Sequence, residues 1–162
     1  MSMTPNIPKP RSRGRLYLTS PDPDVKPALD FRYFTDADDY DGRTLVDGIR
    51  IAREIAAQAP LAGWLKREVC PGPEITSDED LSEYARKVAH TVYHPAGTCR
   101  MGAPDDALAV VAPDLRIRGL DGIRIADASV FPTMTTVNPM IGVLMVGEKC
   151  ADLLGATYGG HA

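Results

Sequence analysis

Two short segments hold the side chains of this chain that are best suited to acid–base chemistry. Residues 93–102 read YHPAGTCRMG, and residues 137–139 read VNP about forty positions later. In the first segment Pro95 restricts His94 to an extended backbone, and Gly97 permits a tight turn just afterwards. The spacing predicts a rigid bend that presents one imidazole, which is the arrangement that a general base requires.

The other histidines and the cysteine of the first segment carry weaker signals. A lone histidine is more often a packed or surface residue than a catalytic one, and we interpret His90 and His161 in that way. Cys99 could suggest a thiol nucleophile, but nothing around it identifies an activating arrangement. A buried inert thiol is therefore the favoured interpretation of Cys99.

Asn138 has two interpretations. Asn is a common N-cap residue, so on the residues alone Asn138 is expected to cap a helix that begins at Pro139. The same position places an amide side chain where a helix N-terminus directs positive potential. For residues 127–129 (DAS), the sequence alone favours a strand end followed by a turn.

Composition excludes several classes of protein. A length of 162 residues predicts one domain, or one domain and part of another. The net charge of −4 argues against a basic nucleic-acid footprint. There is no apolar run of membrane-spanning length and no signal-peptide core at the start. Three widely spaced cysteines predict reduced thiols in a cytoplasmic protein, with no disulfide framework and no structural metal.

Hydrophobic periodicity predicts the elements that would position these segments. We expect strands at residues 14–20 and 28–34 and a helix that starts in the acidic cluster at 38–41 and ends before Pro60. A short helix over residues 61–68 follows, and then a helix over residues 78–92 with Ser77 as its N-cap. Further along, short strands at residues 114–118 and 123–127 precede an apolar helix over residues 139–154 and a frayed tail over residues 158–162.

Taken together, residues 93–102 and 137–139 resemble the active-site signature of the glucose–methanol–choline (GMC) family of flavin alcohol oxidoreductases. They are most similar to its choline oxidase and choline dehydrogenase branch. The resemblance implies that His94 lies beside a flavin and takes the substrate hydroxyl proton while a hydride passes from carbon to FAD. It also implies that Asn138 hydrogen-bonds the substrate oxygen opposite the histidine.

The resemblance further implies contacts with the cofactor. Asp127 and the backbone of Ala128 would lie along the ribityl–pyrophosphate region of FAD. The helix start at Pro139 and the N–H of Met140 would face the flavin pyrimidine edge. No Gly-x-Gly-x-x-Gly fingerprint occurs in the sequence. We therefore expect the catalytic portion to work with a second chain that carries the dinucleotide-binding half.

The expected fold class is α+β. Residues 1–102 would form part of the substrate-binding domain, an antiparallel sheet with flanking helices that carries the catalytic histidine. Residues 103–162 would complete the FAD-binding α/β domain. The function implied is oxidation of an alcohol to an aldehyde or ketone. Two alternatives stay open, namely a non-catalytic fragment or binding subunit and a hydroxynitrile lyase of the same family.

Overall fold

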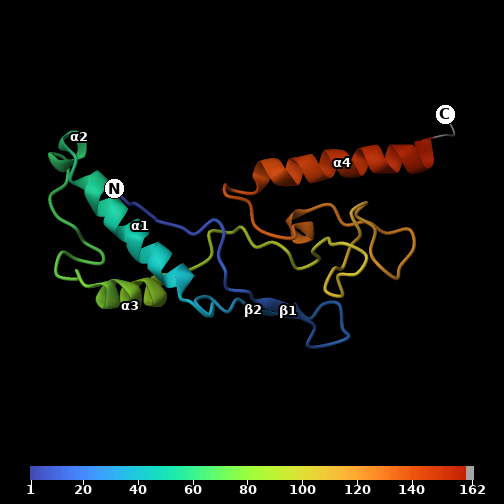
Figure 1. The fold of residues 1–162 in the computed structure, drawn as a ribbon, viewed down its shortest axis with the longest axis horizontal. Coiled ribbons are helices and arrows are strands. Elements are labelled where there is room, and N and C mark those ends of the chain that lie inside the picture. Colours follow the sequence, from blue (N-terminus) through green and yellow to red (C-terminus); the bar gives the residue numbers. More distant parts are fainter. Residues whose placement is uncertain (160–162) are drawn as a thin grey trace. The chain divides into compact units, whose positions relative to one another are not determined.

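The chain divides into two compact units, one over residues 1–92 and one that begins at Tyr93 (Figure 1). The computed structural model describes residues 1–159. His94 therefore belongs to the second compact unit. The assignment of residues 1–102 and 103–162 to a substrate-binding domain and an FAD-binding domain stays a prediction.

The first unit begins with a two-stranded antiparallel sheet. Strands β1 (Arg15–Tyr17) and β2 (Ala28–Asp30) pair with Leu16 opposite Leu29. The predicted strands are confirmed in position but are shorter than expected. Beyond β2, Arg32 and Phe34 have φ angles of 50° and 58°, which lie in the left-handed region and are incompatible with a continuing strand.

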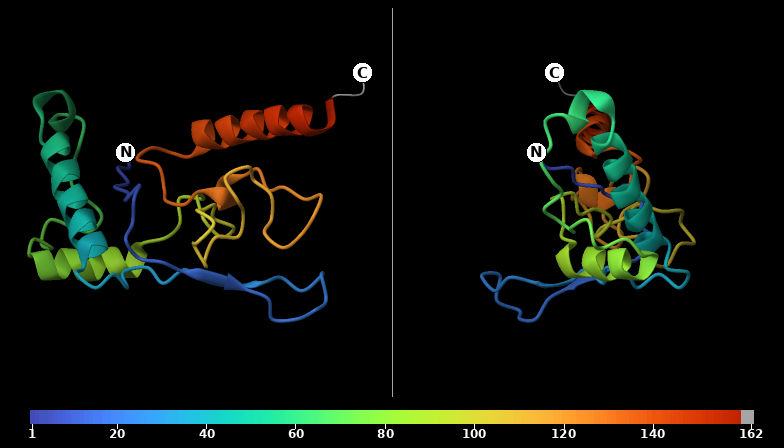
Figure 2. Two further views of the ribbon diagram at one scale, coloured as in Figure 1. Left: turned by 45° about the vertical axis from the view of Figure 1, so that its right-hand side comes forward. Right: turned by 90° about the vertical axis from the view of Figure 1, so that its left-hand side faces the viewer.

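Helices α1 (Tyr40–Ala56) and α3 (Asp78–Val88) pack against each other in the first unit (Figure 2). Their contact buries Val46 on α1 and both Leu81 and Ala85 on α3. The Ser77 hydroxyl accepts a hydrogen bond from the Asp80 N–H at 3.1 Å, so the predicted N-cap is confirmed. At the other end α3 stops at Val88 instead of residue 92, because Ala89 is extended.

The helix predicted over residues 61–68 is wrong in length and position. The structure has a single helical turn, α2 (Ala59–Ala62), with Pro60 in its first turn. Residues 65–70 that follow contain no helix. Proline is favourable at the first helical positions because its missing N–H would have no partner there. Pro60 therefore lies inside the helical turn, whereas the sequence predicts a helix that begins after Pro60.

Two aspartates hold the entry to α1. The carboxylate of Asp36 accepts the Tyr40 N–H at 2.5 Å and the Asp41 N–H at 3.3 Å, and the Ser12 hydroxyl donates to it at 3.2 Å. The buried Asp41 carboxylate in turn accepts the backbone N–H groups of Arg11 and Ser12 at 2.8 and 2.9 Å. Residues 11–12 are thereby fixed to the first turn of α1.

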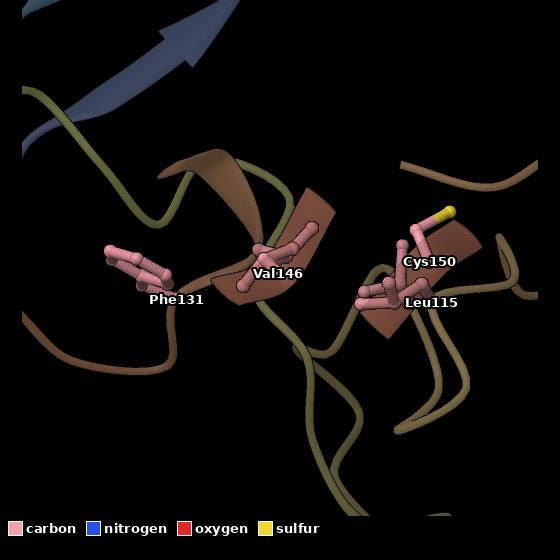
Figure 3. Close-up of a cluster of buried hydrophobic side chains, with 6 residues drawn as sticks. Leu115, Phe131, Val146 and Cys150 are labelled. Atoms are coloured by element: carbon pink, nitrogen blue, oxygen red, sulfur yellow. The ribbon is translucent and has the colours of Figure 1, made fainter. Parts of the chain in front are cut away.

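The second unit is built around a core of six buried residues, four of which are labelled in Figure 3. Val146 and Cys150 come from helix α4 (Met140–Tyr158), and Leu115 and Phe131 come from the loops beneath it. Val111 and Val130, which complete the set, have no exposed surface. The segments that cover the core from below are loops joined by isolated bridges instead of a sheet.

In place of the strands predicted at residues 114–118 and 123–127, the structure has isolated bridges. Arg116 pairs with Arg124, and Ile117 pairs with Val111, each over one residue pair. Leu115, inside the first of these predicted strands, has a φ angle of 68°, and its side chain is buried in the core. A continuous strand cannot contain a left-handed residue, which explains the difference.

Helix α4 begins where the sequence predicts and ends later. It continues past Leu154 and through Gly155 to Tyr158. Of the tail expected over residues 158–162, residues 160–162 lie outside the described part. One face of α4 meets the core, whereas Met140, Ile141, Leu144 and Met145 are exposed. Within residues 1–159, none of the helices has the length and apolar character that crossing a membrane would need.

The pKa of the Asp36 carboxyl gives a testable pH dependence. Desolvation raises this pKa, but the hydrogen bonds from Asp41, Tyr40 and Ser12 outweigh it and leave the pKa below its ordinary value. The folded state therefore holds the proton less tightly than the unfolded state, so the stabilisation is complete above the ordinary pKa of about 3.9 and is lost as pH falls through the lowered value.

We expect Asp36→Asn to flatten the acid side of the stability curve. The measurement is the urea midpoint of unfolding at a series of pH values from neutral downward. Asp24→Asn, an exposed aspartate outside this cluster, is the matched control. An acid limb of unchanged slope in Asp36→Asn would contradict this account of the helix entry.

Candidate active site

The loop that carries His94 has a constrained backbone. Tyr93 has a φ angle of 65°, which is uncommon for a bulky residue. Pro95 then disfavours helical geometry at His94, and Gly97 turns the chain again with a φ angle of 81°. Left-handed residues on both sides of His94 produce the sharp bend that the sequence predicts. The His94 side chain is half-buried.

Three backbone hydrogen bonds tie this loop to residues 128–130. The N–H groups of Gly97, Cys99 and Met101 donate to the carbonyl oxygens of Ala128, Ser129 and Val130, at 3.2, 2.9 and 2.8 Å respectively. Residues Ala128–Val130 form one turn of 3₁₀ helix. Because alternate N–H groups of the loop meet successive carbonyls of this turn, the loop has a fixed register against it. We call this contact the 97–101/128–130 ladder.

Asp127 begins the 3₁₀ turn as its cap. Its carboxylate Oδ1 accepts the Ser129 N–H at 2.8 Å, and the side chain is otherwise exposed. The strand end and turn that the sequence favours at residues 127–129 are thus replaced by a capped helical turn. Ala128 is half-buried, and its carbonyl faces the His94 loop.

Asn138 lies just before α4 and does not cap it. The capping position is Pro139, which is buried, and no side chain caps the helix. Among residues 1–159 the amide of Asn138 makes no hydrogen bond, and this residue is exposed. The first bond of the helix runs from the Val143 N–H to the Pro139 carbonyl at 2.9 Å. The N–H groups of Met140 and Ile141 therefore precede the helix ladder and have no acceptor within it.

Two arginines brace the chain after the His94 loop. Arg100 forms an ion pair with Asp106 at 2.9 Å, as expected for a residue that binds acids locally. Arg118 was missed by the sequence interpretation. Its guanidinium donates to the carbonyl oxygens of Asp106 at 2.8 Å, Gly102 at 2.9 Å and Ala103 at 2.5 Å. No local pattern marks this role, since the acceptors are carbonyls that any residue supplies.

The cysteines of the chain are all free. Cys99 is half-buried instead of fully buried, while Cys150 is the buried thiol in the core of the second unit. Within the described residues, no group of three or more His, Cys, Asp and Glu side chains is arranged to hold a metal ion.

The close approach at Gly97 can be tested by substitution. A Cβ at Gly97 would lie 3.2 Å from the carbonyl oxygen of Phe131, in addition to the cost of a left-handed φ angle. Gly119 has a φ angle of 78° and nothing within 4 Å of the same position, so it is the matched control.

We expect Gly119→Ala to lower the free energy of unfolding by about 1–2 kcal/mol, the cost of left-handed geometry. Gly97→Ala should cost about 1 kcal/mol more, because the carbonyl of Phe131 must also move. Urea denaturation of both variants measures the difference. Equal losses would mean that the ladder tolerates a side chain at Gly97.

The chain matches known proteins over most of its length. Residues 10–147 match the family model described as GMC oxidoreductase. Choline oxidase from Arthrobacter globiformis is 52% identical over 160 residues, which cover 99% of this chain and 29% of that protein. An alcohol dehydrogenase [acceptor] from Pseudomonas putida is 41% identical over 145 residues, covering 90% of this chain and 26% of the relative. The chain thus spans less than a third of the length of these relatives.

Solved structures give the same result for the fold. Pyridoxine 4-oxidase from Mesorbium loti is similar with a TM-score of 0.81 and 30% identity, over 96% of this chain and 29% of that one. Formate oxidase is similar with a TM-score of 0.81 and 29% identity, over 93% of this chain and 26% of that one. With the match to residues 10–147, the braced His94 loop and the open start of α4, the chain belongs to the GMC oxidoreductase family.

Proposed function

We propose that this chain is the C-terminal catalytic portion of an FAD-dependent enzyme that oxidises an alcohol to an aldehyde or ketone. The observation that carries the proposal is the attachment of the His94 loop to residues 128–130, inside the unit that also holds Asn138. The relatives support it, because they include a choline oxidase and an alcohol dehydrogenase. Choline is accordingly the first alcohol to test.

His94 is the proposed general base. Within residues 1–159 its ring makes no hydrogen bond, so both ring nitrogens are open to a substrate hydroxyl. Removing the hydroxyl proton gives the oxygen alkoxide character, which makes the adjacent carbon a better hydride donor. Pro95 disfavours helical geometry at His94, and the ladder beyond it fixes the loop from which the imidazole projects, which suits a general base.

Asn138 is proposed to position the substrate oxygen. Its amide is exposed and is not used as a helix cap, so its N–H₂ group can donate to an alcohol or alkoxide oxygen. Because the side chain stands at the start of α4, the positive end of the helix dipole adds to the same effect. A neutral donor next to a developing negative charge lowers the barrier when it is fixed in advance.

When bound, FAD would supply the hydride acceptor, and residues around the start of α4 would hold part of it. The start of α4 fits one edge of such a ring system, because the N–H groups of Met140 and Ile141 have no acceptor in the helix and Pro139 shapes the turn before them. We assign Asp127 and Ala128 to the ribityl–pyrophosphate region. The chain has no glycine-rich fingerprint for the dinucleotide, so its residues fit only part of the cofactor.

We further propose that a dinucleotide-binding half on a second chain covers the exposed face of α4. Met140, Ile141, Leu144 and Met145 are each exposed by 59–66% on this face. Such a contiguous apolar surface marks an interaction site in a folded protein. The relatives are more than three times as long as the part matched here, which leaves room for that half.

Substitution of His94 tests the catalytic assignment. In the flavin-loaded enzyme, His94→Ala should slow oxidation of the alcohol about 10²–10⁴-fold, the usual contribution of a positioned base. His90→Ala, four residues earlier, is the matched control and should keep wild-type activity, since within residues 1–159 the His90 ring bonds just the neighbouring Thr91 carbonyl.

The measurement is the rate at which the alcohol bleaches the flavin under anaerobic conditions. An unchanged rate in His94→Ala would contradict the assignment and favour a motif retained for packing. Substrate turnover without any bleaching in the wild-type enzyme would instead favour the lyase.

Flavin retention tests whether a dinucleotide-binding half on a second chain is needed. We expect the purified chain alone to be colourless between about 350 and 500 nm, because its donors fit only one edge of the ring system. Mixed with the dinucleotide-binding half of the enzyme, it should recover flavin absorption bands, and Leu144→Asp on the exposed face should weaken that recovery. Tight flavin binding by this chain alone would contradict the proposal.

A further inference from the structure

Phe131 contacts both elements that carry the proposed catalytic residues. Its carbonyl oxygen lies so close to Gly97 that a Cβ there would be 3.2 Å away. Its ring lies against Gly142 of α4, where a Cβ would be 3.0 Å from Cζ and 3.6 and 3.8 Å from the Cε atoms. Each of the two contacts depends on a glycine. One residue therefore contacts both the His94 loop and the first turn of α4.

Phe131 is itself held firmly. It is 7% exposed, and its N–H donates to the Ala128 carbonyl at 3.2 Å. The same carbonyl accepts the Gly97 N–H at 3.2 Å. The ring belongs to the core cluster and packs with Val146 one turn further along α4. A side chain added at Gly142 therefore meets a ring whose backbone has little room to move.

Gly142 is close in sequence to the proposed donors. It follows Asn138 by four residues and Met140 by two, and it shares the first turn of α4 with Met140. A helical turn moves as a rigid element, so a displacement at Gly142 is passed to the N–H of Met140 and to the attachment point of Asn138. The loop with His94 is fixed by the ladder, and its Gly97 lies against the Phe131 carbonyl.

We propose that Phe131 is a positioning residue that sets the separation between His94 and the donors at the start of α4. The inference rests on the proposed function, because it concerns the geometry of the alcohol-oxidation site. Phe131 acts through its two neighbours and needs no contact with substrate or flavin. Its effect is to keep the base and the oxygen-binding groups at the spacing that the transition state requires.

The first test is Gly142→Ala in the flavin-loaded enzyme, with Gly155→Ala as the matched control. Both substitutions replace a glycine of α4 and give the same gain in helix propensity, but a Cβ at Gly155 has nothing within 4 Å. A misplacement of 1 Å can cost about 100-fold in rate. For the few tenths of an ångström needed at Gly142, we expect flavin reduction to slow about 10-fold, with flavin content unchanged.

The second test is rescue. Phe131→Leu removes the far edge of the ring, so the double variant Phe131→Leu with Gly142→Ala should recover most of the lost rate. Phe131→Leu alone should slow flavin reduction, because the spacer is shortened. In each variant the rate constant of anaerobic flavin reduction, the KM for the alcohol and the flavin content are measured together. A purely structural role would change flavin content and stability without this pattern of loss and recovery.

The outcomes separate this inference from the proposed function. If the wild-type enzyme is not bleached by any alcohol, the proposed function fails. If the wild type is bleached but Gly142→Ala matches Gly155→Ala, the inference fails and the function stands. Failure of the double variant to recover would likewise overturn it. If Gly142→Ala does not retain flavin, the Phe131→Leu variant provides the test instead. A wild-type rate of flavin reduction in Phe131→Leu would refute the positioning role.

Discussion

The second unit depends on the 97–101/128–130 ladder. Its loops contain no sheet, so their buried N–H groups need specific acceptors, and a buried donor without one is costly. The three carbonyls of the 3₁₀ turn supply those acceptors at 2.8–3.2 Å. Val130 fixes this 3₁₀ turn in place, because it is fully buried beneath α4. The positions of the imidazole, the turn and the helix start are therefore consequences of one packing arrangement.

This arrangement requires unusual backbone geometry at two non-glycine residues of the second unit. Tyr93 and Leu115 have φ angles of 65° and 68°, which cost energy for residues with a Cβ. Leu115 is 2% exposed, and its burial in the core offsets that cost. Tyr93 is exposed and has no comparable burial. This strained residue directly precedes the candidate base, His94.

The sequence predicts the three long helices better than the contacts that join the loops around the candidate residues. The hydrophobic periods of α1, α3 and α4 are local, so their existence follows from the residues alone. The bridges near Leu115 and the contact of Phe131 with Gly142 join loops to one another and to α4, and no helical or strand period of hydrophobic residues encodes such contacts. Asn138 illustrates the limit, because its propensity to cap a helix is real but Pro139 occupies that position.

The boundary between Val92 and Tyr93 has a consequence for which contacts set the candidate site. His94, the 3₁₀ turn and Asn138 all belong to one compact unit, with its own core and its own hydrogen bonds. Contacts inside this unit therefore set their mutual geometry. The residues proposed for bond breaking and the contacts that hold them are encoded in one continuous stretch of sequence.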